Sequence, residues 1–583
     1  MKRARRLASQ FDALGAMAAR VSRGVQNRLS MSRAARRVWM APSGPLTFFY
    51  PDTLRPGDAL RGELWLAGDF TLPGGVVRAS AENGPFANAP PTAAYLASLH
   101  SFDWLPDVLS VRGGAGHEAA RAALLDWLHG PYLTKPVFMT PGIIGRRLSN
   151  WLMALGVLRH NFDAQEMVRL QNAFGAQARW LAPRWHQAED GMDRLHAVAG
   201  LTLAGLAMSD DGRLLRRGMD GLRRELRRQI LPDGGHVSRA PDALLTILAD
   251  CIAIEGGLAA RQIDPPSQFS QTIARMQSMV ILMRHNNGEL ACFHGGLSAD
   301  KGRIDAVLPR RKKGPAMSFA QKSGYQRMEA GRACVLIDAA NPPQGAAGRH
   351  GHAAPLAFEM SYGGDKFITN CGPNLVHGED WRLAARGLPA HATLAFERDV
   401  TDPFLRSGFA ARHLGARLKP LDWQVQCRRV EDKSGIWLEM SHAGFVRTHG
   451  VRHNRRFFMD ALGEDIRGED LLLADVNHIA RDGAPFHLRF HLHPDIRATL
   501  QGGGDNVLLL SRAGHGFQFR MAGSGSPQTL PQLRIEESVY MGRNGVPQRT
   551  QQLAIFGVLG HTDTLVQWAM RYVGKSQKAP PTL

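Results

Sequence analysis

The sequence predicts a multidomain α+β protein in which a helical domain precedes an antiparallel β-sandwich. Two observations carry this prediction: apolar residues recur at helical spacing between about residues 95 and 283, and with a period of two after about residue 333. A chain of 583 residues also exceeds what one hydrophobic core normally holds, so at least two large domains are expected. The hydrophobic fraction of 44% and the charged fraction of 21% are those of a folded globular protein.

The N-terminal half contains at least seven helical stretches in series, joined by short loops rich in Gly, Pro and Asp. Short connections join antiparallel neighbours, so this series predicts a toroid or solenoid of helical hairpins. We assign residues 46–315 to this domain, including a short lead-in that is punctuated by Pro and Gly.

The C-terminal half consists of strand-length runs separated by turn residues, with no helical period between them. Such a pattern indicates an antiparallel sandwich, which we assign to residues 316–575. Residues 576–583 are predicted to be a disordered tail. One strand, PFHLRFHLHPD, carries three histidines and an arginine on one face, namely His487, Arg489, His491 and His493. Such a face is typical either of a cleft lining for an anion or of a solvated outer face.

Residues 1–45 form a basic amphipathic segment. Its apolar residues recur at spacings of three and four, with Arg on the other face, which predicts an amphipathic helix. These residues are Leu7, Phe11, Leu14, Ala18, Val21, Val25 and Leu29. The helix could make peripheral contact with an anionic membrane, or it could dock onto its own protein. The segment lacks the apolar run of a secretory signal peptide, and no eighteen-residue apolar stretch predicts a transmembrane helix.

The charge balance narrows the classes of partner. Lys and Arg number 71 against 52 Asp and Glu, a net charge of +19 that attracts nucleic acid, an anionic membrane or an acidic polysaccharide. A coding bias that favours Arg over Lys would produce the same net charge without any polyanionic partner. No nucleic-acid-binding motif is found, so no nucleic-acid partner is expected. The five cysteines are widely spaced and odd in number, which favours a reducing compartment over a disulfide framework. The oligomeric state stays open.

One stretch concentrates the residues that proton transfer at a sugar acid needs. Removal of the C5 proton of a uronic acid requires a group that neutralises the carboxylate, a base and an acid, and Arg, His and Tyr suit these roles. The densest such group is RHGHAAPLAFEMSYGGDKFITNCGPN followed by EDWRLAARGLPAHATLAF. A hydrolase would instead need a pair of carboxylates, and no convincing pair stands out.

The run from His350 to Gly372 resembles the hallmark of the heparinase II/III-like family, in which a His-x-His element precedes a strand and a Gly-Gly turn. WRLAARGLPAHATL, RRFFMDALGEDIRGEDLLL, FHLHPD and ESVYMG are also similar to segments of its bacterial members. The resemblance implies an incomplete (α/α) toroid before the sandwich. It also implies a lyase that cleaves a uronic-acid polysaccharide, such as a glycosaminoglycan or alginate, by β-elimination in the cleft between the domains.

The resemblance assigns roles to residues of the β-domain. His350 matches the catalytic histidine of the family, with Arg349 beside it as a cation for the carboxylate. His352, Asn370 and His391 match the ligands of a structural zinc. Because Asn replaces the usual Asp and is a poorer zinc ligand, a metal-free hydrogen-bonded cluster is the alternative.

The helical domain should contribute a Tyr and an Asn or His. The matching segments, EDGMDRLHAVAGL and LPDGGHVSRAP, offer other residues, and no Tyr follows the proline. We therefore expect catalytic roles for Asp193, His236, Arg239 and Tyr325. Substrate-binding roles are expected for Arg194, His196, Arg382 and Arg386.

The leading hypothesis is thus an acidic-polysaccharide lyase. A non-catalytic envelope protein that binds polysaccharide on the same scaffold is the alternative, and a hydrolase on a helical toroid is a third. The resemblance implies the cell envelope, whereas the N-terminus alone indicates the cytoplasm or the cytoplasmic face of a membrane.

Overall fold

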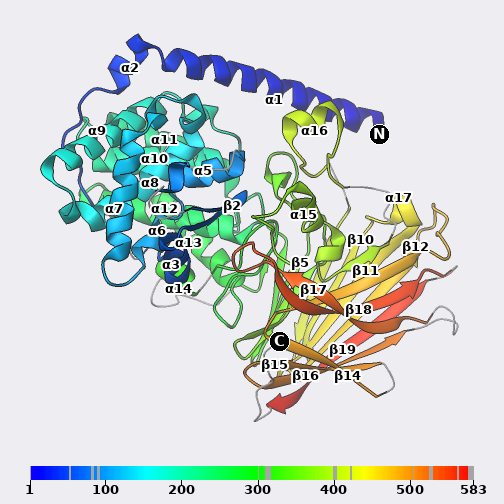
Figure 1. Ribbon diagram of the computed structural model, residues 1–583. Helices are drawn as coiled ribbons and strands as arrows, with labels where there is room; N and C mark the ends of the chain where they lie inside the picture. The colour runs from blue at the N-terminus through cyan, green and yellow to red at the C-terminus, as the bar shows by residue number, and fades with distance from the viewer. Residues whose placement is uncertain are drawn as a thin grey trace.

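The structure is a computed structural model that describes residues 2–50, 54–79, 84–87, 92–299, 301–308, 317–397, 403–419, 423–502, 505–523, 530–560 and 563–575. It confirms the predicted fold class, because helices make up the N-terminal half and antiparallel sheets the C-terminal half (Figure 1). The predicted tail, residues 576–583, lies outside the described residues.

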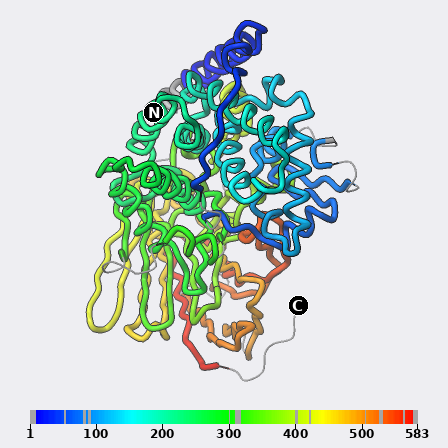
Figure 2. The backbone as a smooth tube through the Cα atoms, turned by 90° about the vertical axis from the view of Figure 1, so that its left-hand side faces the viewer, coloured from blue at the N-terminus to red at the C-terminus, as the bar shows by residue number. Residues whose placement is uncertain are grey.

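The helical half consists of two N-terminal helices and a toroid of helical hairpins. The helices are α1 (Lys2–Ser30), α2 (Arg33–Trp39), α3 (Ala59–Leu66), α4 (Gly84–Ala87), α5 (Ala93–Ser101), α6 (Leu105–Leu109), α7 (Ala115–His129), α8 (Pro141–Leu158), α9 (Ala164–Leu181), α10 (Met192–Ala207), α11 (Arg213–Gln229), α12 (Pro241–Ala260), α13 (Ser267–Leu282) and α14 (Lys301–Val307). A small hairpin of β1 (Asp69–Leu72) and β2 (Gly75–Arg78) belongs to the lead-in. Figure 2 shows the extended segment after α2 running along the outside of these helices.

Helix α10 lies at the centre of the helical domain, between α8, α11 and α12. Its crossing with α8 is close because glycines face each other there. A Cβ atom on Gly145 would lie 2.1 Å from the carbonyl oxygen of His196, and one on Gly200 would lie 2.2 Å from that of Gly145. These glycines therefore fix the depth at which the N-terminal half of α10 sits in the domain.

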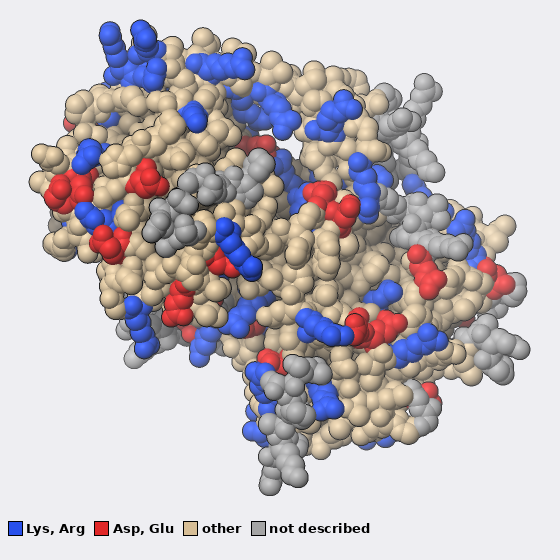
Figure 3. Space-filling view, in the orientation of Figure 1, with Lys and Arg blue, Asp and Glu red and all other residues tan. Residues whose placement is uncertain are grey.

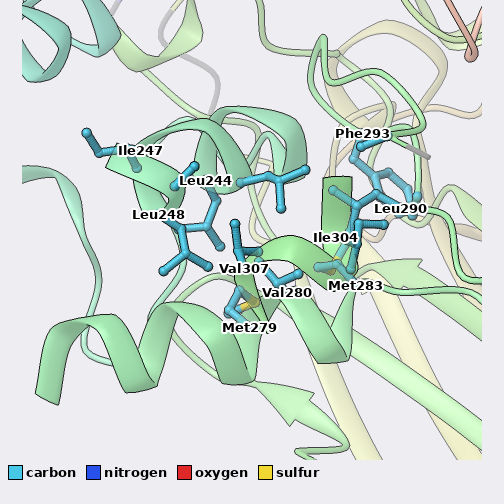
Figure 4. Close-up of a cluster of buried hydrophobic side chains, with 14 of the residues drawn as sticks. Leu244, Ile247, Leu248, Met279, Val280, Met283, Leu290, Phe293, Ile304 and Val307 are labelled. Atoms are coloured by element: carbon cyan, nitrogen blue, oxygen red, sulfur yellow. The ribbon is translucent and has the colours of Figure 1, made fainter. Parts of the chain in front are cut away.

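Helix α12 is the one described helix that is long and apolar enough to cross a membrane by length and composition. In the structure 61% of its apolar window is buried inside the protein. Leu244, Ile247 and Leu248 pack there with residues of α13, of α14 and of the segment that leads to the sandwich (Figure 4). Its apolar character thus serves the core of the helical domain.

The C-terminal half is a sandwich of two antiparallel sheets. Its strands are β3 (Phe319–Ala320), β4 (Tyr325–Ala330), β5 (Ala333–Asp338), β6 (Phe358–Tyr362), β7 (Asp365–Thr369), β8 (Leu394–Phe396), β9 (Gln426–Asp432), β10 (Gly435–His442), β11 (Val451–Asp460), β12 (Asp465–Ala474), β13 (Pro485–Leu492), β14 (Ile496–Gln501), β15 (Asn506–Ser511), β16 (His515–Gly523), β17 (Gln532–Tyr540), β18 (Gln548–Val558) and β19 (Thr564–Lys575). One sheet has the order β14-β15-β16-β19-β12-β11-β10-β9, and the other β17-β18-β13-β7-β6-β5-β4-β3 with β8 against β13. Short helices α15 (Glu379–Ala384), α16 (Gly408–Leu414) and α17 (Val446–His449) interrupt the strands.

Aromatic side chains fill the space between the sheets. Phe358 of β6 stacks on Trp568 of β19 with ring centroids 5.7 Å apart, and Phe490 of β13 meets the same indole edge-to-face at 5.1 Å. The strands alternate as the period of two predicts, with one set of side chains in this core.

A buried ion pair connects the two domains. Arg239, from the loop before α12, pairs with Asp338 at the end of β5, and both side chains are almost fully buried. The Arg239 guanidinium also donates to the backbone carbonyls of Ser323 and Asn341, at 2.7 and 3.0 Å. The second carboxylate oxygen of Asp338 lies 2.9 Å from Nε2 of His294.

Removal of the Asp338 carboxylate should destabilise the protein strongly, because a buried guanidinium would lose its counter-charge. We expect Asp338→Ala to lower the free energy of unfolding by about 3–5 kcal/mol, measured by urea denaturation with tryptophan fluorescence. Glu537→Ala, which removes the carboxylate from an exposed ion pair with Arg549, is the matched control and should leave the denaturation midpoint unchanged. Equal effects of the two variants would contradict a role of Asp338 in joining the domains.

Candidate functional site

A continuous cleft runs between the helical domain and the sandwich. It comprises two cavities of about 700 and 510 Å³, and both are lined by His196, Asp242 and Thr246. The larger cavity lies between the lead-in, the helical domain and residues 375–377 and 544–546 of the sandwich. The smaller is enclosed by the start of α10, the loop before α12 and residues 344–350 of the sandwich.

His350 lines the smaller cavity, as the sequence predicted for the catalytic histidine. It follows a short 3₁₀ turn, and its side chain is exposed in the wall of the cleft. The chain before and after it is held by Arg386, whose guanidinium donates to the carbonyls of Gly348 and Gly351 at 3.2 and 3.0 Å. Partial desolvation in the cleft wall, and then the positive charges of Arg382 and Arg386, lower the pKa of His350 to about 4. The imidazole is therefore neutral at pH 7 and can accept a proton.

Asp193, His196 and His236 line the same cavity from the helical side. Burial raises the pKa of the Asp193 carboxyl and lowers that of His196 well below its ordinary value. His236 has no free ring nitrogen: Nε2 lies 3.0 Å from the acceptor Oε1 of Gln229, and Nδ1 lies 2.7 Å from Oγ of Ser238. Its Nε2 therefore donates to Gln229, and its Nδ1 accepts from Ser238.

Several cavity-lining residues were missed by the sequence analysis. Glu189 forms an ion pair with Arg349 across the cleft, and Asp190 pairs with Arg228 at 2.9 Å. Glu189 and Asp190 belong to the segment that was matched to the family, but nothing local distinguishes them from surface acids. Only the approach of the sandwich shows that Glu189 faces a cation.

The charge of the cleft is balanced, although the chain as a whole is strongly basic. Seven arginines and seven carboxylates line the described cavities. The arginines are Arg55, Arg61, Arg78, Arg146, Arg228, Arg303 and Arg349, and each has a carboxylate partner within 4 Å. The acids are Asp69, Asp103, Asp107, Glu189, Asp190, Asp193 and Asp242. The excess of positive charge thus lies outside the cleft, and Figure 3 shows basic side chains gathered along the edge formed by α1 and α2.

Arg239 and Tyr325, which the sequence analysis assigned to catalysis, lie in the domain interface and do not line the described cavities. The Tyr325 hydroxyl donates to the carbonyl of Arg239, and burial raises its pKa well above the ordinary value. The Arg239 guanidinium lies 4.9 Å from the centre of the Tyr325 ring. Both polar groups are used within the protein, so the prediction was wrong for these two residues.

The tyrosine expected at the cleft is not supplied by another part of the chain. All seven tyrosines lie in the described ranges, and none lines the two cavities. The segment that should carry it continues from Pro241 with Asp242 and Ala243, and both of these residues line the smaller cavity.

Three arginines predicted to bind substrate also lie outside the described cavity linings. Arg194 donates to the carbonyl of Ala188, and Arg382 pairs with Glu379 on its own helix. Arg386 is buried, and its guanidinium contacts backbone carbonyls. Arg386 therefore acts by holding the His350 segment, and the prediction of direct substrate contact was wrong in its case.

The predicted zinc ligands form a hydrogen-bonded cluster. Nδ1 of His352 lies 2.6 Å from Nε2 of His391, and Nδ1 of His391 lies 2.7 Å from the carbonyl of Gly387. The carbonyl of Gly387 requires a proton on Nδ1 of His391, so Nε2 of His391 carries the lone pair that faces His352. The backbone amides of His294 and Gly295 lie 3.2 and 2.8 Å from Nδ1 and Nε2 of His352. The Asn370 amide donates to Glu359 at 3.2 Å, and its oxygen accepts from the amide of Ala392.

This cluster does not fit a zinc ion. Two nitrogens that share one tetrahedral zinc lie about 3.3 Å apart and direct lone pairs at it, whereas the two imidazoles here bond to each other. Among the residues that the structure describes, no group of three or more His, Cys, Asp or Glu side chains is placed to hold a metal ion. The contacts of His352 and His391 with each other favour the metal-free alternative, which stays a prediction.

We expect the melting temperature of the wild type to be unchanged by EDTA. Asn370→Asp should lower it, because a carboxylate would then face Glu359, and added zinc should not restore it. Asn374→Asp, also buried but hydrogen-bonded to the backbone at His377, is the control for the loss of one amide. A loss of stability in EDTA would contradict the metal-free cluster.

The buried histidines should make the protein sensitive to acid. Burial lowers the pKa of His391 to about 4, and that of His352 well below its ordinary value. Between pH 6.5 and 4 the unfolded chain binds protons that the folded chain does not, so stability is fully present above pH 6.5 and is lost as the pH falls. We expect a flat melting temperature between pH 7 and 8 and a decline below 6.5. The decline should be shallower in His391→Gln and unchanged in His478→Gln, a control at an exposed histidine.

The fold and the cleft define a protein of the polysaccharide-lyase architecture, a helical toroid followed by a β-sandwich. A family model described as "Heparinase II/III-like, C-terminal" matches residues 312–569. The chain belongs to the heparinase II/III-like family.

Among individual proteins, the chain is 33% identical over 482 residues to "FtsZ-localized protein C" of Caulobacter vibrioides, covering 81% of this chain and 82% of that protein. Its fold is similar to the crystal structure of heparinase III, with a TM-score of 0.62 at 13% identity, over 84% of this chain and 79% of that one. Heparan sulfate lyase HepC from Pedobacter heparinus is similar with a TM-score of 0.55 at 14% identity, over 94% of this chain and 88% of that one. At such identities the two structures establish the fold alone.

Proposed function

We propose that the protein binds a polysaccharide of low net charge in the cleft between its domains and does not cleave it by β-elimination. One observation carries this proposal: the cleft contains two cavities of about 700 and 510 Å³, but its arginines are paired with carboxylates and no tyrosine lines it. A highly sulfated or uronate-rich chain would have to displace those ion pairs, whereas neutral sugar hydroxyls can hydrogen-bond to them.

Elimination needs three groups around one sugar ring. His350 is suited to accept the C5 proton because it is exposed and neutral. The substrate carboxylate needs a cation that is available to it, yet Arg349 already pairs with Glu189. The leaving oxygen needs an acid, and His236 cannot serve because both its ring nitrogens are hydrogen-bonded.

A second candidate is the acidic-polysaccharide lyase that the family resemblance implies. Two observations favour it: the neutral His350 on one wall of the cavity, and the raised pKa of Asp193 on the other. The Asp193 carboxyl, whose pKa is raised by burial, would take the place of tyrosine as the acid. Opening of the Arg349–Glu189 pair would then supply the cation.

The place of action is proposed from the relative. Since the chain is similar over four fifths of its length to a protein named for its localisation with FtsZ, we propose that it acts at the site of cell division. A fluorescent fusion that spreads evenly through dividing cells would contradict this proposal.

Binding and elimination are separated by two measurements on the same samples. We expect wild-type protein to bind at least one polysaccharide from a panel of neutral and acidic polymers, measured by calorimetry, with no rise in absorbance near 232 nm. Thr246→Trp, which places an indole where the two cavities meet, should weaken binding at least tenfold. Val168→Trp, at an exposed position on α9, is the control and should bind as the wild type does.

A rise at 232 nm that is lost in His350→Ala would establish the lyase instead. Failure to bind any polymer in the panel, or equal binding by Thr246→Trp and the wild type, would overturn the proposed site.

A further inference from the structure

Helix α1 presents an unpartnered apolar stripe to solvent. Phe11, Leu14, Val21, Val25 and Leu29 are 70, 47, 60, 53 and 65% exposed. At 100° per residue these positions, with Ala18, fall within a sector of about 80°. A stripe of this length on a soluble protein marks a surface that another phase or molecule covers.

The opposite side of α1 faces the protein. Ala13 and Ser30 are buried, and Ala16, Met17 and Asn27 are half-buried. The helix contacts α2 and the α16 segment of the sandwich, so it extends along one edge of the molecule from the helical domain to the sandwich (Figure 1). Helix α1 therefore docks onto the protein, but through Ala13, Ala16 and Met17, while the stripe of larger apolar residues faces solvent.

The positive charge of the segment that carries this stripe indicates an anionic partner. Residues 1–50 contain ten Lys and Arg and one acidic residue, Asp12, so nine of the nineteen net positive charges lie in less than a tenth of the chain. Arg20 and Arg28 on α1, and Arg33 and Arg37 on α2, are exposed. On α2 the neighbouring Val38 is 76% exposed.

We propose that α1 and α2 form an interfacial membrane anchor, in which the apolar stripe of α1 inserts into the surface of an anionic bilayer and the flanking arginines bind lipid phosphates. A helix of 29 residues is about 44 Å long and lies in the plane of the interface with its apolar face below the headgroups. Apolar burial and charge act together here, since neither a neutral bilayer nor a purely polar polyanion satisfies both faces of the helix.

The anchor lies close to the cleft. Helix α1 contacts α16, and Leu418, which follows α16, donates its backbone N–H to the carbonyl of Gly348 at 3.3 Å, two residues before His350. A protein attached through α1 would therefore hold its sugar-binding cleft beside the bilayer surface. The anchor itself stands on residues outside the cleft, so its test does not depend on what the cleft binds.

The test is co-sedimentation of the full-length protein with vesicles of phosphatidylcholine alone or with 30% phosphatidylglycerol. The wild type should bind the anionic vesicles at least tenfold more tightly than the neutral ones, with affinity that falls as salt is added. Leu14→Asp/Val21→Asp puts two carboxylates into the stripe and should weaken binding to anionic vesicles at least tenfold. Ala19→Asp/Gln26→Asp puts two carboxylates at exposed positions beside the stripe, with the same spacing of seven, and should weaken it less than threefold.

Equal loss in the two double variants would overturn the insertion of the stripe, because charge alone would then explain binding. A wild type that binds neither kind of vesicle would overturn the anchor. Dimer formation through the stripe, without binding to anionic vesicles, would also overturn the anchor. Light scattering without lipid would show it as a dimeric wild type, a monomeric Leu14→Asp/Val21→Asp variant and a dimeric Ala19→Asp/Gln26→Asp variant.

Discussion

The buried contact of Arg239, Asp338 and His294 holds the two domains in one arrangement. Arg239 belongs to the helical domain, Asp338 to the sandwich and His294 to the segment between them. Arg239 and His294 both adopt left-handed backbone conformations, with φ of 61° and 50°, which non-glycine residues adopt only when surrounding contacts enforce them. The ion pair offsets the free-energy cost of these backbone conformations only while Arg239 and Asp338 stay buried together.

The geometry of the cleft follows from that contact. The backbone of His294 and Gly295 lies against the ring of His352, at 3.2 and 2.8 Å, and His352 bonds to His391. His350 lies two residues before His352, and its Cβ atom is 3.0 Å from where a Cβ of Gly295 would be, so only glycine lets the loop approach this closely. The polar cluster therefore has a structural task, since its contacts hold the wall that presents His350.

The cleft and the N-terminal helices are two surfaces with different charge, a difference that the net charge of the whole chain does not reveal. The arginines and the carboxylates that line the cleft are equal in number, which is the basis for proposing a sugar polymer with little charge as its ligand. The N-terminal helices carry the basic excess together with an apolar stripe, and they suit an anionic interface. Under the two proposals together, the protein would hold a polysaccharide close to a membrane, a task that requires no tyrosine in the cleft.

The sequence by itself determined the order of the domains, the amphipathic helix and the place of His350 in the cleft. These depend on local periodicity and on a motif of neighbouring residues, both of which a linear chain displays. The tertiary structure decided that Arg239 and Tyr325 serve the interface, because their partners lie about a hundred residues away. The tertiary structure also buries His487 and His491 of β13, so they form neither a cleft lining nor a solvated face. His487 pairs with Glu397, and His491 contacts the Ser538 hydroxyl and the carbonyl of Pro389. Pairing of the cleft arginines and the outward direction of the α1 stripe likewise depend on which surfaces meet, and long-range packing alone determines that.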